Sequence, residues 1–527
     1  MALGYILFLL ATAISWTRAD VDPFFNDSTF DEGAYGPYPQ KSYKSVGLWS
    51  PRPNILQWDT QCEDGQYTFW TPRGNRVDEA GAMILDSKGD FVWWRGGYGQ
   101  VYNMQVQEYR GELYLTFWAG DDTVGGHGAG YYYMLDSSYK QVHKLGAANG
   151  LDGDLHEFQI TPEGTALISV YEVIDGDLTP FGHEKDGKIW DCLIQEIDLA
   201  TGKLLFQWRA SEHYELTETQ REVPNPDPFD FFHLNSIDKD LKGNYLISSR
   251  FTFTVTYING VTGDIIWILG GKRNNFTDLS GGKATGFMYQ HDARWSDDYT
   301  TITIFDNGAE DWHYVEPYTR GIRIKIDQEA MTAELVTEYA NPHHIYGMSQ
   351  GSLQTLPNGN VLMGYGNTGA MTEYAGDGTV LCDVHFGPET WFGSGDIQSY
   401  RTYKFNWVGR PDTKPDIAFV RSDDPASNET SVFVSWNGDT EVRRWVLEGT
   451  DDVEAGKWSA LNEVARKGFE SQILMKNITA PYVRARGLDK DGKVLGETDA
   501  WNWKEPKVSY SLPISRSSPS TSLNHAF

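Results

Sequence analysis

The sequence predicts an all-β protein in which a six-bladed β-propeller is followed by a small β-sandwich. Two hairpin patterns alternate along most of the 527 residues, which is typical of repeated four-stranded units. Aromatic residues make up 14% of the chain, which is too high a share for a disordered protein. After Arg410-Pro411 the pattern changes to short alternating strands without the repeat.

The first hairpin pattern joins an apolar strand to a second strand through an Asp-Gly, Thr-Gly, Lys-Gly or other acidic or small turn. Period-two alternation with such turns predicts β-hairpins. The copies are Ala82–Trp94, Tyr131–Leu145, Cys192–Trp208, Thr254–Leu269, Gly321–Val336 and Met371–His385.

The second hairpin pattern alternates with the first, so that each repeat holds four strands. Its copies are Asn103–Trp118, His156–Tyr171, His233–Arg250, His291–Asp306 and Gln350–Tyr365. Units of about 40–70 residues with four strands predict propeller blades. We expect Ile397–Trp407 to close the ring against the segment Ile55–Trp70. An open β-sandwich with long loops is the alternative, and it predicts irregular spacing.

The segments of the chain follow from these patterns. We expect a signal peptide at 1–19, an extended arm at 20–48, the propeller at 49–410, a fibronectin type III or immunoglobulin-like sandwich at 413–505 and a disordered tail at 506–527. The apolar run near the N-terminus is short for a membrane anchor, which is the alternative to cleavage, and no other segment predicts a membrane span.

The charge and the sequons indicate where the protein acts. A net charge of -29 argues against nucleic-acid binding, which needs a basic face. The signal peptide and four Asn-x-Ser/Thr sequons favour a secreted or secretory-pathway glycoprotein, with acceptors at Asn26, Asn275, Asn428 and Asn477. One disulfide among Cys62, Cys192 and Cys382 fits this location, but the sequence leaves the pair open.

Three histidines occupy the same position of the repeat. His156, His233 and His291 each open a strand of the second hairpin type, and Gln350 takes the matching place in the next unit. Because the innermost strands of a propeller line its axis, we expect these imidazoles to meet. Arg250 ends the strand that pairs with the His233 strand, and we expect it to return to the same place.

Other residues near this predicted cluster are assigned by their phase. Asn235 lies two residues after His233, so we expect it on the same side of the strand. Four histidines fall outside the repeat phase and are predicted to be loop or surface residues; they are His127, His313, His343 and His344. The tryptophans are predicted to pack between blades.

The residue types favour chemistry on an anion. The sequence holds no H-x-H or H-E-x-x-H pair, and Arg250 would repel a cation, so no metal is expected. No Gly-rich loop opens a helix and no G-x-S-x-G elbow appears, so neither a nucleotide cofactor nor a serine nucleophile is expected. Histidine, asparagine and arginine suit a sulfuryl or phosphoryl group.

Several motifs follow one another along the chain. They are His233-Leu234-Asn235-Ser236-Ile237-Asp238, Leu246-Ile247-Ser248-Ser249-Arg250, Trp267-Ile268-Leu269-Gly270-Gly271, Gln290-His291-Asp292, Phe305-Asp306-Asn307-Gly308 and Gln350-Gly351-Ser352 with Leu356-Pro357-Asn358-Gly359-Asn360. Together they resemble the arylsulfotransferase (ASST-like) family in its fungal branch. The resemblance runs from about Tyr43 to Trp407 and implies a six-bladed propeller.

The resemblance also implies roles for these residues. His291 matches the channel histidine that is transiently sulfurylated by a phenolic sulfate ester, without a nucleotide donor or other cofactor. His233 and Arg250 match the residues that hold the sulfuryl group and the leaving oxygen, and His156 matches a further channel histidine. Asn235 and Gln350 are expected to bind substrate. The chain departs from the bacterial members, which carry an N-terminal β-sandwich.

Three functions therefore compete. The first is transfer of a sulfuryl group from a phenolic sulfate to a phenol through a sulfo-histidine. The second is acid–base chemistry in a specialised-metabolite pathway, namely cyclisation, dehydration or isomerisation of an aromatic or polyketide intermediate. The third is a propeller that binds a ligand without catalysis. The expected partners of the enzyme are small phenolic or aryl sulfate substrates.

Overall fold

The computed structural model describes residues 20–503 except 125, 222–227, 297, 311–312 and 423–426. The predicted signal peptide at 1–19 and the predicted tail at 506–527 lie outside the described residues. In the described part the chain is all-β, with one α-helical turn and five short 3-10 helices. No helix in this part has the length and apolar character needed to cross a membrane.

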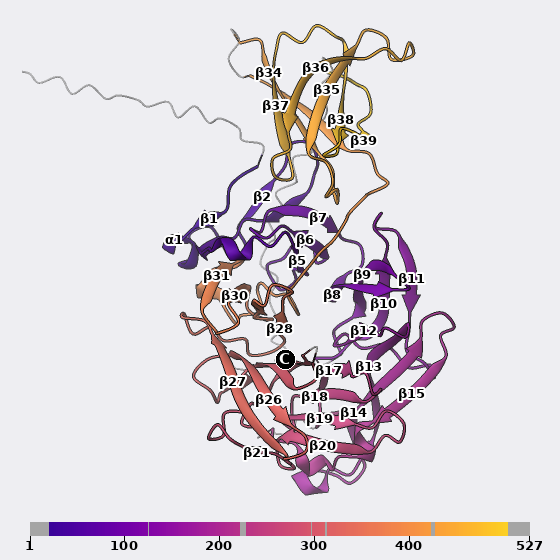
Figure 1. Cartoon of the computed structure of the whole chain (residues 1–527), viewed down its shortest axis with the longest axis vertical. Coiled ribbons are helices and arrows are strands. Elements are labelled where there is room, and N and C mark those ends of the chain that lie inside the picture. Colours follow the sequence, from indigo (N-terminus) through magenta and orange to yellow (C-terminus); the bar gives the residue numbers. More distant parts are fainter. Residues whose placement is uncertain are drawn as a thin grey trace, which may run out of the picture.

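Most of the strands belong to sheets that follow one another along the chain. In Figure 1 their colours run from purple through magenta to orange around the larger body of the molecule. The first of these sheets joins the start and the end of this region. It holds β5 (Tyr67–Trp70), β6 (Ala82–Leu85), β7 (Phe91–Arg95) and β32 (Tyr403–Phe405).

The second, third and fourth sheets are consecutive antiparallel strands. The second holds β8 (Gln100–Tyr109), β9 (Glu112–Asp121), β10 (Ala129–Leu135) and β11 (Gln141–Leu145). The third holds β12 (Phe158–Ile160), β13 (Thr165–Gly176), β14 (Gly187–Asp198) and β15 (Leu204–Arg209), with β16 (Phe229–Asp230) beside β14. The fourth holds β17 (Leu234–Lys239), β18 (Tyr245–Ser249), β19 (Thr254–Ile258) and β20 (Ile265–Gly270).

The fifth and sixth sheets extend the same four-stranded plan with short outer strands. The fifth holds β22 (His291–Trp295), β23 (Thr301–Asp306), β26 (Arg320–Asp327), β27 (Thr332–Ala340) and β21 (Thr277–Asp278). The sixth holds β28 (Ser352–Thr355), β29 (Val361–Gly364), β30 (Ala370–Tyr374), β31 (Val380–His385), β4 (Asn54–Gln57) and β1 (Phe24–Phe25). Two small ribbons pair β2 (Gln40–Ser42) with β3 (Trp49–Pro51) and β24 (Ala309–Glu310) with β25 (His313–Tyr314).

The hairpins predicted from alternation are antiparallel strand pairs in these sheets. Their turns use local side-chain capping. At the turn between β17 and β18, Oδ1 of Asp240 accepts from the backbone N–H of Lys242 and of Asn244, both at 2.9 Å. Gly243 in this turn has a φ of 83°, which a residue with a Cβ adopts only with strain. Local sequence therefore sets these hairpins.

The first strands of successive sheets lie beside one another. β8 contacts β5 and β12, β17 contacts β22, and β22 contacts β28. β12, β17 and β28 are labelled close together near the middle of the body in Figure 1. The first strand of a sheet therefore lies beside the first strand of a neighbouring sheet in each of these pairs. The predicted closing strand is shorter than expected. Tyr403–Phe405 pairs with Tyr67–Phe69 of β5, and an isolated bridge joins Gln398 to Arg73.

Aromatic side chains fill the space between adjacent sheets. Trp267 of β20 lies 6.0 Å from Trp295 of β22 in an edge-to-face arrangement, and Tyr257 of β19 stacks on Trp267 at 5.0 Å. All three belong to one hydrophobic cluster shared by the fourth and fifth sheets. Such pairs add about 0.5–1.5 kcal/mol each beyond burial of their surface.

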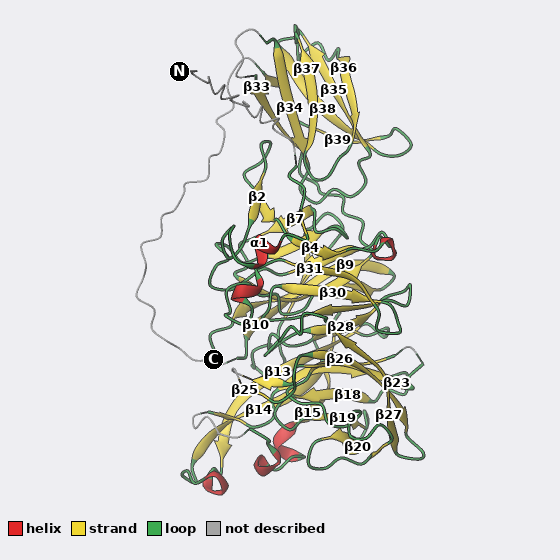
Figure 2. Cartoon of the chain, turned by 90° about the vertical axis from the view of Figure 1, so that its left-hand side faces the viewer, coloured by secondary structure: helices red, strands yellow, loops and turns green. Residues whose placement is uncertain are grey.

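Two further antiparallel sheets form the C-terminal part, which Figure 2 shows at one end of the molecule. One holds β33 (Asp416–Arg421), β34 (Glu429–Ser435) and β37 (Ser471–Lys476). The other holds β36 (Ser459–Ala465), β35 (Arg444–Thr450), β38 (Tyr482–Leu488), β39 (Val494–Glu497) and β40 (Trp501–Asn502). Their side chains share a hydrophobic cluster around Trp445. The sequence analysis missed β36, an edge strand whose side chains are mostly exposed or half-buried.

The predicted extended arm contains a helical turn. Asp27 caps α1 (Ser28–Asp31) by accepting from the N–H of Thr29 at 2.9 Å, and Phe30 in this turn is fully buried. Further along the arm, Oε1 of Glu470 accepts from the N–H of Lys44 at 2.8 Å and of Ser45 at 2.6 Å. The arm therefore binds the C-terminal sheets.

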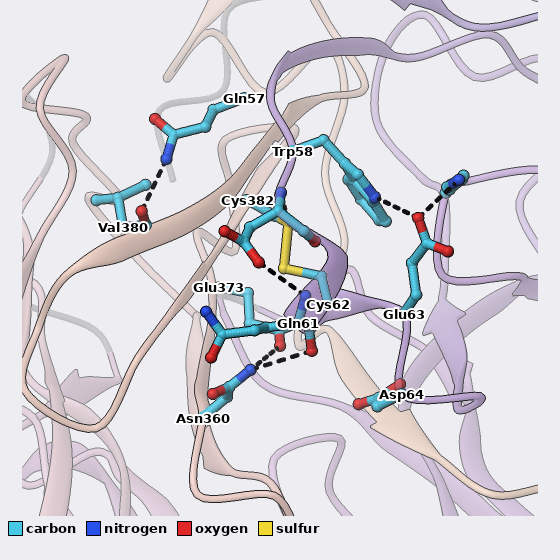
Figure 3. The surroundings of a disulfide bond; sticks show 12 residues. Gln57, Trp58, Gln61, Cys62, Glu63, Asp64, Asn360, Glu373, Val380 and Cys382 are labelled. Atoms are coloured by element: carbon cyan, nitrogen blue, oxygen red, sulfur yellow. Dashed lines mark hydrogen bonds and ion pairs between the residues drawn. A yellow bond between two sulfur atoms is a disulfide. The ribbon is translucent and has the colours of Figure 1, made fainter.

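The structure assigns the disulfide that the sequence left open. Cys62 in the 3-10 turn Thr60–Cys62 is bonded to Cys382 of β31, 320 residues later (Figure 3). Nearby, Nδ2 of Asn360 donates to the carbonyl of Gln61 at 3.4 Å. Cys192 of β14 is a buried free thiol. The other 3-10 turns are Thr179–Phe181, Ala210–Glu212, Leu216–Glu218 and Glu389–Trp391.

Candidate functional site

The three histidines selected by repeat phase lie at the starts of successive first strands. His156 precedes β12 by two residues, His233 immediately precedes β17 and His291 is the first residue of β22. Their exposed fractions are 3%, 5% and 1%. The rings of His156 and His233 are 4.9 Å apart. The tertiary structure thus brings together residues that are far apart in the sequence.

Arg250 and His291 belong to the same cluster. The N–H of Arg250 donates to the carbonyl of His233 at 2.9 Å, and its guanidinium donates to the carbonyl of Met348 at 2.9 Å. Burial lowers the pKa of His291 well below its ordinary value, and the positive charge of Arg250 lowers it further. His291 is therefore neutral at pH 7, which is the form of a nucleophile.

Hydrogen bonds fix the tautomer of His291. Nδ2 of Asn307 donates to the carbonyls of Gly347 at 2.5 Å and of Gln350 at 3.0 Å, so its Oδ1 faces Nδ1 of His291 at 2.7 Å. An amide oxygen only accepts, so Nδ1 carries the proton. Nε2 then holds the lone pair, and it accepts from the N–H of Gln350 at 3.2 Å.

Each of the other two histidines is paired with an aspartate that the sequence analysis did not select. Nδ1 of His156 lies 2.7 Å from Oδ2 of Asp154, and Nδ1 of His233 lies 2.5 Å from Oδ2 of Asp230. Burial acts to raise the pKa of Asp154, but His156 outweighs it and the pKa lies below the ordinary value. Such a pairing holds the imidazole and stabilises its protonated form.

His233 is also neutral at pH 7. Burial lowers its pKa well below the ordinary value, and its neighbours His156 and Arg250 act in the same direction. The aspartate beside it differs from Asp154, because burial raises the pKa of Asp230. The two Asp–His pairs are therefore chemically distinct although they face each other.

His127 corrects the sequence analysis, which assigned it to a loop or the surface. It lies in the loop between β9 and β10, but its exposed fraction is 1%. Its ring stacks on Tyr171 at 4.0 Å and lies 5.2 Å from the ring of His233. The glycines that flank His127 in the sequence could have indicated close packing. In the structure, a Cβ on Gly128 would lie 2.5 Å from the ring of Trp118. His313, His343 and His344 are exposed, as predicted.

The two residues predicted to bind substrate make contacts within the protein. Nδ2 of Asn235 donates to the carbonyl of Gln290 at 2.7 Å, and Asn235 is fully buried. Gln350 contacts His291 through its backbone N–H, while its Oε1 accepts from Arg73 at 2.5 Å. In this structure both residues position their neighbours, and Arg73 is a further cation that the sequence analysis did not select.

A buried ionic network connects the first strands. Arg401 is 1% exposed, and its guanidinium donates to Oδ1 of Asn103 at 2.9 Å and to the carbonyl of Asn235 at 2.7 Å. It also lies 3.3 Å from Oε1 of Glu157, the neighbour of His156. Residues before β12, in β8 and in β17 are held by this single side chain. It was not selected from the sequence, because Arg401 lies outside the repeat.

The solved structures to which this chain is similar match it weakly, both in sequence and in TM-score. A protein of unknown function from Bacteroides caccae is 14% identical, with 65% of this chain and 99% of that one covered at a TM-score of 0.36. A protein from Lactobacillus plantarum is 10% identical, with 78% and 100% covered at 0.35. Sqt1 from Saccharomyces cerevisiae is 10% identical, with 74% and 83% covered at 0.31.

No curated protein matches the chain. The model of the family described as arylsulfotransferase (ASST) matches residues 105–387, which is more than half of the 527 residues. This match spans all six site residues selected from the sequence and the aspartates paired with two of the histidines. The chain therefore belongs to the arylsulfotransferase family.

Proposed function

We propose that this protein transfers a sulfuryl group from a phenolic sulfate ester to a phenol through a sulfo-histidine at His291. Family membership indicates a transferase that acts on aryl substrates. The observation that carries the proposal is the neutral His291, whose Nδ1 proton is directed at Asn307 while the lone pair of Nε2 stays available. Attack requires Nε2 to exchange the N–H of Gln350 for the sulfur atom.

In the first half-reaction, Nε2 of His291 attacks sulfur and forms the N–S bond. The bond between sulfur and the aryl oxygen breaks, and its electron pair leaves with the phenolate oxygen. Arg250 stabilises the charge that develops on the sulfuryl and phenolate oxygens. Loss of one such donor typically costs about 10²–10³ in rate.

In the second half-reaction, the oxygen of an acceptor phenol attacks the same sulfur atom and the N–S bond breaks. The phenolic proton moves to Nε2 of His233, whose Nδ1 faces Asp230. The proton is then released from His233 to water, and the phenolate released in the first half-reaction takes up a proton from water. One group carries the sulfuryl unit between two substrates, so ping-pong kinetics are expected.

The second candidate function is acid–base chemistry on an aromatic or polyketide intermediate. The arrangement that favours it is the pair of Asp–His units whose histidine rings are 4.9 Å apart. One imidazole can remove a proton while the other returns it to a different atom. This reaction needs no attack by His291.

An assay with p-nitrophenyl sulfate and phenol separates these functions. Release of p-nitrophenol that requires phenol and disappears in His291→Ala supports sulfuryl transfer, and His183→Ala, at an exposed turn, is the matched control. No release, with His156→Ala and His233→Ala each blocking a cellular product, supports the second function. Unchanged biological function after joint replacement of His233, Arg250 and His291 leaves a propeller that only binds its ligand.

We propose that this site lies on the axis of a six-bladed propeller. Each of the first six sheets described above is one blade. The contacts between first strands support it. The two C-terminal sheets are proposed to be a fibronectin type III or immunoglobulin-like sandwich at 413–505. The layout of the sequence motifs supports assignment to the fungal branch of the family.

We also propose that the protein is a secreted or secretory-pathway glycoprotein. The asparagines of all four sequons are exposed, and the Cys62–Cys382 disulfide suits an oxidising compartment. Treatment of the protein from its native host with an N-glycosidase tests this. A decrease in mass that is removed by the joint replacement of Asn26, Asn275, Asn428 and Asn477 supports the proposal, and an unchanged mass contradicts it.

A further inference from the structure

We propose that His127, Asp230 and His233 bind a divalent transition-metal ion. The three residues are buried, and one ligand atom from each lies within 4.8 Å of the others. Two imidazoles and one carboxylate are a common ligand set for zinc and related ions in proteins. The three residues come from the loop before β10 and from the segment at β16 and β17.

Three polar atoms of this group lack a hydrogen-bond partner. Neither ring nitrogen of His127 forms a hydrogen bond within the described residues, and neither does Oδ1 of Asp230. Buried polar groups without a partner cost free energy, so native proteins rarely contain them. An unpartnered imidazole beside an unpartnered carboxylate oxygen indicates that a polar species binds between them.

The spacing suits coordination by one ion. Nε2 of His127 lies 3.4 Å from Oδ2 of Asp230. Two ligands at 2.0–2.2 Å from a tetrahedral metal are about 3.3–3.6 Å apart. His233 lies closer to Asp230, at 2.5 Å, and metal binding would replace their hydrogen bond with two metal–ligand bonds. Three protein ligands leave a fourth position open, as in catalytic zinc sites.

The ring of His127 is held in place by its neighbours. Stacking on Tyr171 holds the ring of His127, and the hydroxyl of Tyr171 is fixed by its bond to the carbonyl of Leu234 at 2.7 Å. The imidazole is thus oriented before the ion arrives.

The charges around the group also allow a cation. The sequence argued against a metal because of Arg250, but the fold adds the carboxylates of Asp154 and Asp230, which counter the charges of Arg250 and Arg221. A divalent ion bound by Asp230 would therefore lie among carboxylates as well as guanidinium groups.

Metal binding at this site does not depend on the proposed sulfuryl transfer. His291 and Arg250 are not ligands, and a neutral His233 that binds a metal through one nitrogen still has the other for substrate. Metal binding is therefore measured directly rather than through activity.

The test is titration of the chelator-treated full-length protein with Co²⁺, followed by its visible absorption bands and by metal analysis after dialysis. We expect about one ion per chain, displacement by Zn²⁺ and a higher Tm with the metal bound. A wild-type protein that binds less than a tenth of an equivalent overturns the proposal.

Two variants locate the ion, and one serves as control. His127→Ala and Asp230→Asn should weaken Co²⁺ binding at least tenfold, while His183→Ala at an exposed turn should bind as the wild type does. Circular dichroism of the metal-free variants checks that they fold. If a folded His127→Ala protein binds Co²⁺ with wild-type affinity, the assignment is wrong.

Discussion

Asn307 holds His291 through a 2.7 Å hydrogen bond between its Oδ1 and Nδ1 of the imidazole. The two residues lie at the start of β22 and just after β23, which are paired antiparallel strands. Because Asn307 also donates to two backbone carbonyls, its amide has one orientation. A neighbouring strand therefore sets which nitrogen of His291 carries the proton.

Replacing Asn307 should affect the chemistry of His291 before it affects binding. Asn307→Ala removes the acceptor that selects the tautomer, and we expect kcat for sulfuryl transfer to fall about 10²-fold, the effect of misplacing a reacting group. Asn462→Ala in β36 of the C-terminal sheets is the control. An unchanged kcat in Asn307→Ala would show that Asn307 does not position the nucleophile.

Asn307→Asp should change the pH profile. A carboxylate beside Nδ1 favours the protonated ring and raises the pKa of His291, which burial and Arg250 otherwise lower. As the pH falls from 8, the wild-type rate should therefore stay constant to below pH 6.5. The variant should begin to lose activity at a higher pH than the wild type does. If kcat/KM of the wild type and of the variant falls at the same acidic pH, the residue at position 307 does not control the protonation of His291.

Replacing Arg401 should destabilise the protein strongly. Arg401→Met removes a buried cation and leaves Glu157 with less compensation, since Arg294 at 2.5 Å is then its remaining ion-pair partner in the described residues. Loss of one member of a buried pair costs about 3–5 kcal/mol. Urea unfolding measures the effect, and the double variant Arg401→Met/Glu157→Gln should recover part of it.

The control for Arg401 is an exposed ion pair. Arg444→Met breaks a pair with Glu463 whose side chains are 42% and 50% exposed, and we expect a loss of stability within about 1 kcal/mol. Equal effects of the two arginine substitutions would mean that the central network does not hold the sheets together.

Reducing the disulfide should lower the stability of the protein. The bond between Cys62 and Cys382 closes 320 residues, and removing a native disulfide typically costs about 2–5 kcal/mol. The Tm of the wild type should fall in dithiothreitol, whereas the double variant Cys62→Ser/Cys382→Ser should have a low Tm that the reductant does not change. A wild-type Tm that is insensitive to full reduction would contradict the prediction.

Glu470 should make stability fall as the pH rises. Burial raises its pKa from 4.5 to about 7, so between these values the folded protein binds a proton that the unfolded chain does not. The free energy of unfolding then falls by about 1.4 kcal/mol per pH unit across that window. Glu470→Gln keeps an acceptor for Ser45 and should show a less steep decline in urea unfolding from pH 5 to 7.

Glu463→Gln serves as the control for this pH dependence, because Glu463 is exposed in β36. Its unfolding free energy should follow the wild-type pH curve. If the unfolding free energy of Glu470→Gln falls with pH as steeply as that of the wild type, Glu470 does not bind a proton where the arm contacts the C-terminal sheets.

Local patterns in the sequence predicted the strands well. Alternation and turn residues act over a few neighbouring positions, so the hairpins, including the turn at Asp240, could be read directly. β36 escaped because an edge strand with few buried side chains has little hydrophobic pattern. The cluster of His156, His233 and His291 could be predicted because residues at the same position of successive repeats lie close together in the fold.

The repeat, the strands and the set of histidines could be predicted from the chain alone, because these depend on spacing along it. The packed fold was needed to show that His127 is buried among the histidines, that Asp154 and Asp230 pair with two of them, and that Cys62 bonds to Cys382. These contacts join loops and strand ends whose burial depends on the packing of separate sheets. No local pattern records such packing, since the partners are distant in sequence or lie outside the repeat.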